Sequence, residues 1–147
     1  MRIALDANVL LYAEGINGRQ RAPQARALVA RLSAEDTVIA VQTLGEVYNV
    51  LVRKAHLPRE QARDAVRHWQ ARFPVVDTTA EVTSEAISLA AAHEINIWDA
   101  VQVAVAASAG CTILLSEDLQ DGFIWRGVEI VNPFSQERQA WLDALLD

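Results

Sequence analysis

The sequence has little of several features that mark special classes of protein. It has one cysteine in 147 residues, Cys111 in the apolar stretch GCTILL, which excludes an internal disulfide framework and indicates a buried thiol in a reducing compartment. No apolar run approaches the roughly 18 residues that span a bilayer, and no N-terminal stretch is built like a secretion signal. We therefore expect a soluble, cytoplasmic protein with no membrane partner.

Basic residues are also scarce. There are 13 Lys and Arg against 19 Asp and Glu, a net charge of −6, which argues against a general basic surface for nucleic acid. Ten of the 13 lie between residues 19 and 72 with five acids, so this region carries +5 and the remainder 3 − 14 = −11. Within the basic region, Arg59, Arg63 and Arg67 recur at four-residue steps on one helix face. That face is either a solvated flank or a stripe that contacts RNA phosphates.

Repeats, low-complexity tracts and linkers are absent as well, so we expect a single domain over residues 1–147. Short apolar runs predict buried strands at residues 3–5, 38–41, 75–76, 112–115 and 128–131. Helical spacing predicts helices at residues 22–32, 44–57, 58–71, 79–93, 98–109 and 135–146. This alternation predicts an α/β fold with a mostly parallel central sheet of about five short strands, covered on both faces.

Four acids need an explanation in such a fold: Asp6, Glu46, Asp99 and Asp118. Asp6 ends the first strand and Asp118 follows the fourth, and parallel sheets bind ligands beyond the carboxyl ends of their strands. Glu46 and Asp99 have an alternative role, because each stands three residues after Thr43 or Asn96, the spacing of a helix capping box. Thr78 and Glu81 share this spacing, but capping does not account for Asp6.

Acids at the ends of buried elements must be compensated, and few basic residues follow Arg72. Hard carboxylate oxygens suit Mg²⁺ or Mn²⁺, with water and substrate phosphate completing the coordination. One or two such ions would activate a water molecule against a phosphodiester. The pattern therefore favours a metal-dependent hydrolase that acts on phosphate esters.

The segments IALDANVLLY, TLGEVYNVL, NIWDAVQVAVA and TILLSEDLQDG, with VEIVNPF after them, resemble the PIN-domain ribonucleases in order and spacing. The resemblance is closest to the VapC toxins of toxin–antitoxin pairs and covers residues 2–134. It implies a PIN-like α/β/α sandwich and an Mg²⁺- or Mn²⁺-dependent endoribonuclease whose cleavage of RNA inhibits translation. It further implies a cognate antitoxin protein as partner, and a homodimer.

Carried over by position, the resemblance places Asp6, Glu46, Asp99 and Asp118 at the acidic positions that hold the metal and catalyse cleavage. It gives supporting places to three more residues: Asn8 and Ser116 would orient water or a carboxylate, and Asp121 is a possible auxiliary acid, although an exposed turn position is the alternative.

Two neighbours of these acids carry expectations of their own. We expect Glu117 to point outward. Trp98, beside Asp99, either stacks on a base or, as we expect, packs against the sheet.

Two other functions stay open at the level of sequence. Asp6 could act as the nucleophile of a haloacid-dehalogenase-like phosphatase, although such enzymes also need a lysine near the phosphate and the only lysine is Lys54. The chain could also be a catalytically inactive PIN-fold binding module, with apolar helix faces that dock a peptide. The nuclease hypothesis requires the four acids to come together in space.

Overall fold

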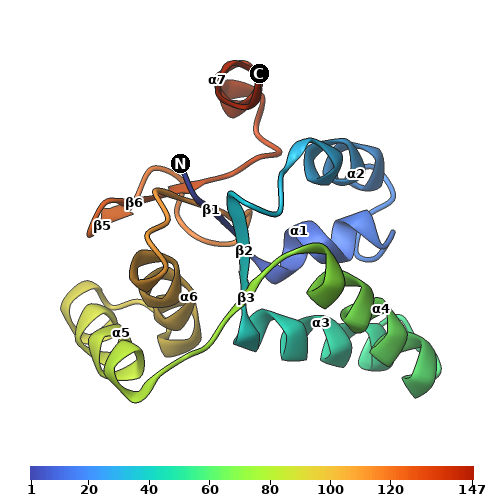
Figure 1. Ribbon diagram of the computed structural model, residues 1–147, viewed down its shortest axis with the longest axis horizontal. Helices are drawn as coiled ribbons and strands as arrows, with labels where there is room; N and C mark the ends of the chain where they lie inside the picture. The colour runs from blue at the N-terminus through green and yellow to red at the C-terminus, as the bar shows by residue number, and fades with distance from the viewer.

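The computed structural model describes residues 1–147, which are built around one six-stranded sheet (Figure 1). The strands are β1 (Ile3–Leu5), β2 (Thr37–Ala40), β3 (Val75–Val76), β4 (Ile113–Leu115), β5 (Ile124–Trp125) and β6 (Val128–Val131). Their order across the sheet is β3-β2-β1-β4-β6-β5. All pairs are parallel except β5 with β6, which form an antiparallel edge.

Helices connect the strands and cover both faces of the sheet. They are α1 (Ala7–Ala13), α2 (Ala22–Arg31), α3 (Val41–Arg53), α4 (Arg59–Arg72), α5 (Ala80–His93), α6 (Ile97–Ser108) and α7 (Gln136–Leu146). In Figure 1, α1 to α4 lie to the right of the sheet and α5 and α6 to its left. None of these helices combines the length and the apolar character needed to span a bilayer.

Alternating side chains of the strands build two separate cores. Ile3 and Leu5 of β1 pack into a core with α1 to α4 and α7, whereas Ala4 between them packs into a core with α5 and α6. A strand that is apolar on successive residues is therefore buried on both sides, as the sequence predicts. The predicted α/β sandwich with a mostly parallel sheet is confirmed, with six strands in place of about five. Cys111 is buried, also as predicted.

The sequence did not predict two short elements of the fold, the helix α1 and the strand β5. The apolar run after Asp6 is the helix α1, in which five of the seven residues are buried. Because this helix has almost no polar face, its sequence shows no helical period. The strand β5 has two residues, one of them the exposed Ile124, so no buried apolar run marks it.

The capping-box prediction is wrong for two of the three helices. The helix α3 begins at Val41 after Ala40, so Thr43 lies inside the first turn and does not cap it. The helix α5 is capped by Thr79, whose hydroxyl accepts from the Val82 N–H, and not by Thr78. At α6 the N-cap is Asn96 as predicted, and its side chain accepts from the Trp98 N–H.

Candidate active site

The sheet brings the predicted acids to the carboxyl ends of its central strands. Asp6 directly follows β1, and Asp118 comes three residues after the end of β4, the strand paired with β1. Glu46 is in the second turn of α3, which continues directly from β2, the other neighbour of β1. Asp99 lies in the first turn of α6. The topology therefore places four distant segments of the chain around one edge of the sheet.

Asp6 is the most buried of these acids, with 8% of its surface exposed. One carboxylate oxygen accepts from the Ala7 N–H at 2.7 Å, and the other accepts from the Ser116 hydroxyl at 2.7 Å. Asp6 is also the N-cap of α1, a role that the sequence did not indicate because α1 itself was not evident. Burial raises the pKa of Asp6 to about 6, and the negative charges of Glu46 and Asp118 add to the rise.

The loop after β4 is tied residue by residue to α1 and α2. Asn8 donates from its amide to Asp118. Tyr12 donates to the Glu117 carboxylate at 2.7 Å, and Arg21 forms an ion pair with the same carboxylate at 3.1 Å. Glu117 is therefore a half-buried residue that anchors the loop, and the expectation that it points outward is wrong. Its orientation depends on the packing of α1, which the sequence did not reveal.

The helices α3 and α6, which carry Glu46 and Asp99, are joined by a buried pair of polar side chains. Thr43 and Gln102, both buried, hydrogen-bond to each other at 2.9 to 3.1 Å. Within α3, the Gln42 amide donates to the Glu46 carboxylate at 2.7 Å. Sequence reasoning missed these three residues as site supports. Gln102 carried a signal, since it is the single polar side chain in the apolar run Val101–Ala107.

The charges of Glu46 and Asp118 act on Asp6, and that of Asp118 acts on Asp99, but the four acids do not form a closed cluster. The pKa of Asp99 is raised, by burial first and then by the charge of Asp118. No three side chains of His, Cys, Asp or Glu lie close enough together to hold a metal ion as they stand. The oxygen donors nevertheless fit Mg²⁺, because this ion is commonly held by one or two carboxylates, with water and substrate phosphate as its other ligands.

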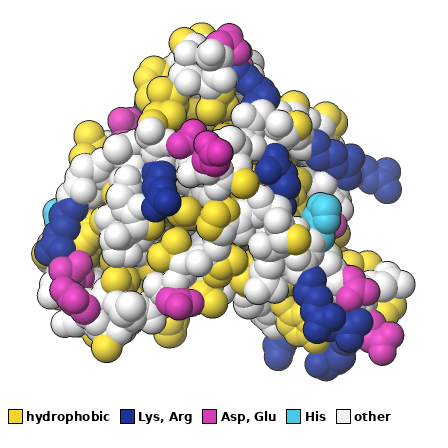
Figure 2. Space-filling model, viewed as in Figure 1, with side chains coloured by type: hydrophobic (Ala, Val, Ile, Leu, Met, Phe, Trp, Pro, Cys, Tyr) yellow, Lys and Arg dark blue, Asp and Glu magenta, His cyan; other side chains and the backbone are white.

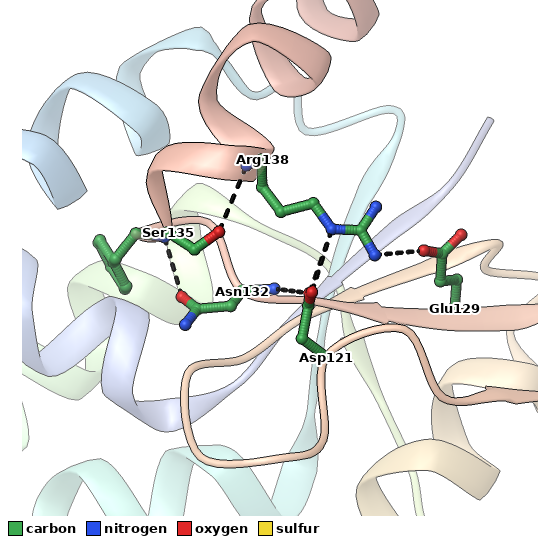
Figure 3. Close-up of polar contacts among 6 residues, drawn as sticks. Asp121, Glu129, Asn132, Ser135 and Arg138 are labelled. Atoms are coloured by element: carbon green, nitrogen blue, oxygen red, sulfur yellow. Dashed lines mark hydrogen bonds and ion pairs between the residues drawn. The ribbon is translucent and has the colours of Figure 1, made fainter.

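Asp121 makes its polar contacts with residues other than these acids, and Figure 3 shows its side chain directed toward Asn132 and Arg138. Its carboxylate accepts from the Asn132 N–H at 2.8 Å and from the Arg138 guanidinium at 3.2 Å. Arg138, with 18% of its side chain exposed, also pairs with Glu129 of β6 at 2.6 Å and so fixes α7 to that strand. These contacts occupy Asp121 and support a structural role in place of an auxiliary catalytic one.

Two surface features differ in how well the sequence predicted them. Trp98 is 62% exposed, so the expectation that it packs against the sheet is wrong; its place in the first turn of α6 turns the ring to solvent. The stripe of Arg59, Arg63 and Arg67 is exposed on α4 as predicted. Figure 2 shows Lys and Arg gathered at the lower right of the molecule, over this helix.

Comparison with known proteins agrees with this architecture. The PIN domain family matches residues 3–122, and the chain belongs to this family. Among curated proteins, none matches the sequence.

Similar folds occur among solved structures. The VapC20 toxin of Mycobacterium tuberculosis, which cleaves the sarcin–ricin loop, is 22% identical over 79% of this chain and 89% of its own, with a TM-score of 0.66. A toxin–antitoxin complex from Klebsiella pneumoniae contains a chain 23% identical over 90% of this chain and 98% of its own, with a TM-score of 0.65. A chain of DNA-bound VapBC from Salmonella typhimurium is 18% identical over 88% of this chain and 96% of its own, with a TM-score of 0.66. The shared property is the fold.

Proposed function

We propose that this chain is a metal-dependent endoribonuclease, the VapC-type toxin of a toxin–antitoxin pair, which hydrolyses RNA phosphodiester bonds and so inhibits translation. The observation that carries the proposal is that Asp6 and Asp118 follow the central strands β1 and β4 of a PIN domain. Glu46 lies on the helix that continues from β2, and Asp99 lines the same cavity as Asp118. The similarity in fold to toxins from several bacteria supports the toxin assignment.

The proposed chemistry assigns a task to each part of the site. A bound Mg²⁺ or Mn²⁺ would supply an activated water and neutralise charge on the phosphate. Asp6, Glu46, Asp99 and Asp118 would hold the ion directly or through water. Ser116, which donates to Asp6, keeps that carboxylate oriented, and Asn8 does the same for Asp118.

A phosphatase with Asp6 as nucleophile is less well supported. Such a site needs a lysine near the attacked phosphate. Lys54 is the C-cap residue of α3, more than two turns beyond Glu46, the residue of this helix whose charge raises the pKa of Asp6.

The test is cleavage of purified cellular RNA by the purified chain with Mg²⁺ or Mn²⁺, with and without a chelator. We expect cleavage that the chelator abolishes, and loss of cleavage in Asp6→Asn. Asp143→Asn is the matched control, because Asp143 is an exposed carboxylate on α7 that pairs with Arg31 and contacts neither the four acids nor the arginines of α4. Cleavage that persists in Asp6→Asn at the parental rate would contradict the proposal.

The proposal includes two protein partners, a cognate antitoxin and a second copy of the chain. The structures from Klebsiella pneumoniae and Salmonella typhimurium are complexes of a toxin with its antitoxin, which supports the first. Expression of the chain should therefore arrest growth, and co-expression of the antitoxin encoded beside it should relieve the arrest. Light scattering of the purified chain tests the dimer.

A further inference from the structure

A hollow of about 320 Å³ opens next to two of the site carboxylates, Asp99 and Asp118. It lies between the start of α6 and the loop after β4. Val103 and Ile130, both buried, give it an apolar interior. Its volume is at the small end of the range for ligand pockets, about 300 to 1,000 Å³, and suits a single flat ring system.

The other lining residues offer stacking and hydrogen bonding. Phe123 is half-buried, and its ring and that of His93 form a T-shaped contact at 5.3 Å, so the two rings do not stack on each other. The Gln120 amide is exposed and hydrogen-bonds to no other side chain. Asn96 uses its amide oxygen to cap α6 and keeps its NH₂ group as a donor. An aromatic ring with nearby amides is the combination by which proteins bind unstacked RNA bases.

Charge determines which part of a nucleotide suits the hollow. The carboxylates of Asp99 and Asp118 at its edge repel a phosphate that no cation accompanies. A base is uncharged, and its flat faces are favourably removed from water by apolar side chains. A base in the hollow would leave the adjoining phosphate beside the acids, where the proposed cleavage takes place.

We propose that this hollow binds the base of a nucleotide next to the cleaved bond, with Phe123 stacking on the base and Gln120 reading its edge. This inference rests on the proposed ribonuclease function and adds a determinant of nucleotide preference to it. Neither residue belongs to the proposed catalytic set.

The first test is cleavage of a random-sequence single-stranded RNA library, followed by sequencing of the cut ends. We expect the unmodified chain to prefer one nucleotide at a position beside the cut. Gln120→Ala and Phe123→Leu should each reduce that preference at this position, by roughly fivefold or more for the stacking residue, while cleavage of the whole library continues. Gln136→Ala, an exposed glutamine on α7, is the matched control and should leave the profile unchanged.

The second test measures binding without cleavage. Labelled pentanucleotides of A, C, G or U are titrated in Mg²⁺ with the Asp6→Asn chain, for which no cleavage is expected, and fluorescence anisotropy gives their relative affinities. If the chain binds one of the four pentanucleotides more tightly and Phe123→Leu removes that preference, the base site is supported. This holds even if the unmodified chain cuts no RNA, a result that would contradict the proposed ribonuclease function. If the chain cleaves RNA but neither substitution changes its nucleotide preference at the cut, the base site is contradicted and the ribonuclease function is not. The hollow would then be a site for a side chain of a protein partner.

Discussion

Asp6 illustrates, at the scale of one residue, how a site acid lowers the stability of its own fold. Its pKa of about 6 in the folded chain compares with 3.8 for an unperturbed aspartate. Between these values the folded chain binds the proton more tightly than the unfolded chain does. The free energy of unfolding therefore falls as the pH rises from about 4 to about 6 and stays low above that, a loss on the order of 2 to 3 kcal/mol.

We predict that Asp6→Asn increases the free energy of unfolding near pH 8, by about 1 to 2 kcal/mol, while it abolishes cleavage. Asparagine keeps an oxygen for the Ala7 N–H and removes the buried charge. The gain should disappear near pH 4, where Asp6 is protonated in the folded chain. Urea unfolding of both proteins in chelator at the two pH values measures this difference. A gain of equal size at both pH values would show that burial of the charge is not its source.

Ser116 provides the second prediction at this scale. Its hydroxyl donates to the Asp6 carboxylate and so lowers the pKa of Asp6 against the effect of burial. A hydrogen bond to a charged group contributes about 1.5 to 3 kcal/mol, so Ser116→Ala should reduce cleavage roughly tenfold near pH 6. The loss should shrink as the pH rises and Asp6 ionises. A pH–rate profile checks this, with Ser116→Thr, which keeps the hydroxyl, as the control.

At the scale of elements, the site depends on how α3 and α6 are held together. The pair of Thr43 and Gln102 is the buried polar link between these helices, and the Gln42 amide adds a longer hydrogen bond at 3.4 Å to the Trp98 carbonyl of α6. Glu46 and Asp99 lie on the turns beside the buried pair. A buried hydroxyl left without its partner costs about 1 to 3 kcal/mol, whereas an apolar pair of similar shape can be nearly neutral.

We therefore predict that Gln102→Leu lowers the free energy of unfolding by about 1 to 3 kcal/mol and that adding Thr43→Val restores part of the loss. The two single variants and the double variant form a double-mutant cycle that chemical unfolding can follow. Strict additivity of the single effects would mean that the hydrogen bonds between the two side chains contribute nothing. Cleavage measured on the double variant then shows whether an apolar link positions the acids as well.

The helices and strands also show which parts of this structure can be predicted from the sequence alone. Strands buried on both faces and helices with one apolar side are evident from periodicity, and the order of strands and helices then places Asp6 and Asp118 at the same sheet edge. The helix α1 is not evident, because burial on nearly all sides removes its period. The orientations of Glu117 and Trp98 follow from the packing of helices against each other, which no local pattern in the sequence records.

Over the whole molecule, the net charge of −6 conceals an uneven distribution. Arg59, Arg63 and Arg67 are exposed on α4, and Arg63 and Arg67 border a hollow of about 300 Å³ between α3 and α4. An acidic protein that cleaves RNA needs a local basic surface, since phosphate contacts supply much of the affinity for nucleic acid. The stripe is the candidate for that surface.

The last prediction tests the stripe through the salt dependence of RNA binding. Each phosphate contact on a single strand contributes about −0.7 to the slope of log K against log salt concentration, so replacing all three arginines by glutamine should reduce the slope by roughly 2. The control replaces Arg2, Arg31 and Arg126 by glutamine, which also changes the net charge from −6 to −6 − 3 = −9. Anisotropy titrations of a labelled single-stranded RNA at several salt concentrations give both slopes. If the two triple variants lose slope equally, the overall charge governs binding and the stripe is a solvated helix flank.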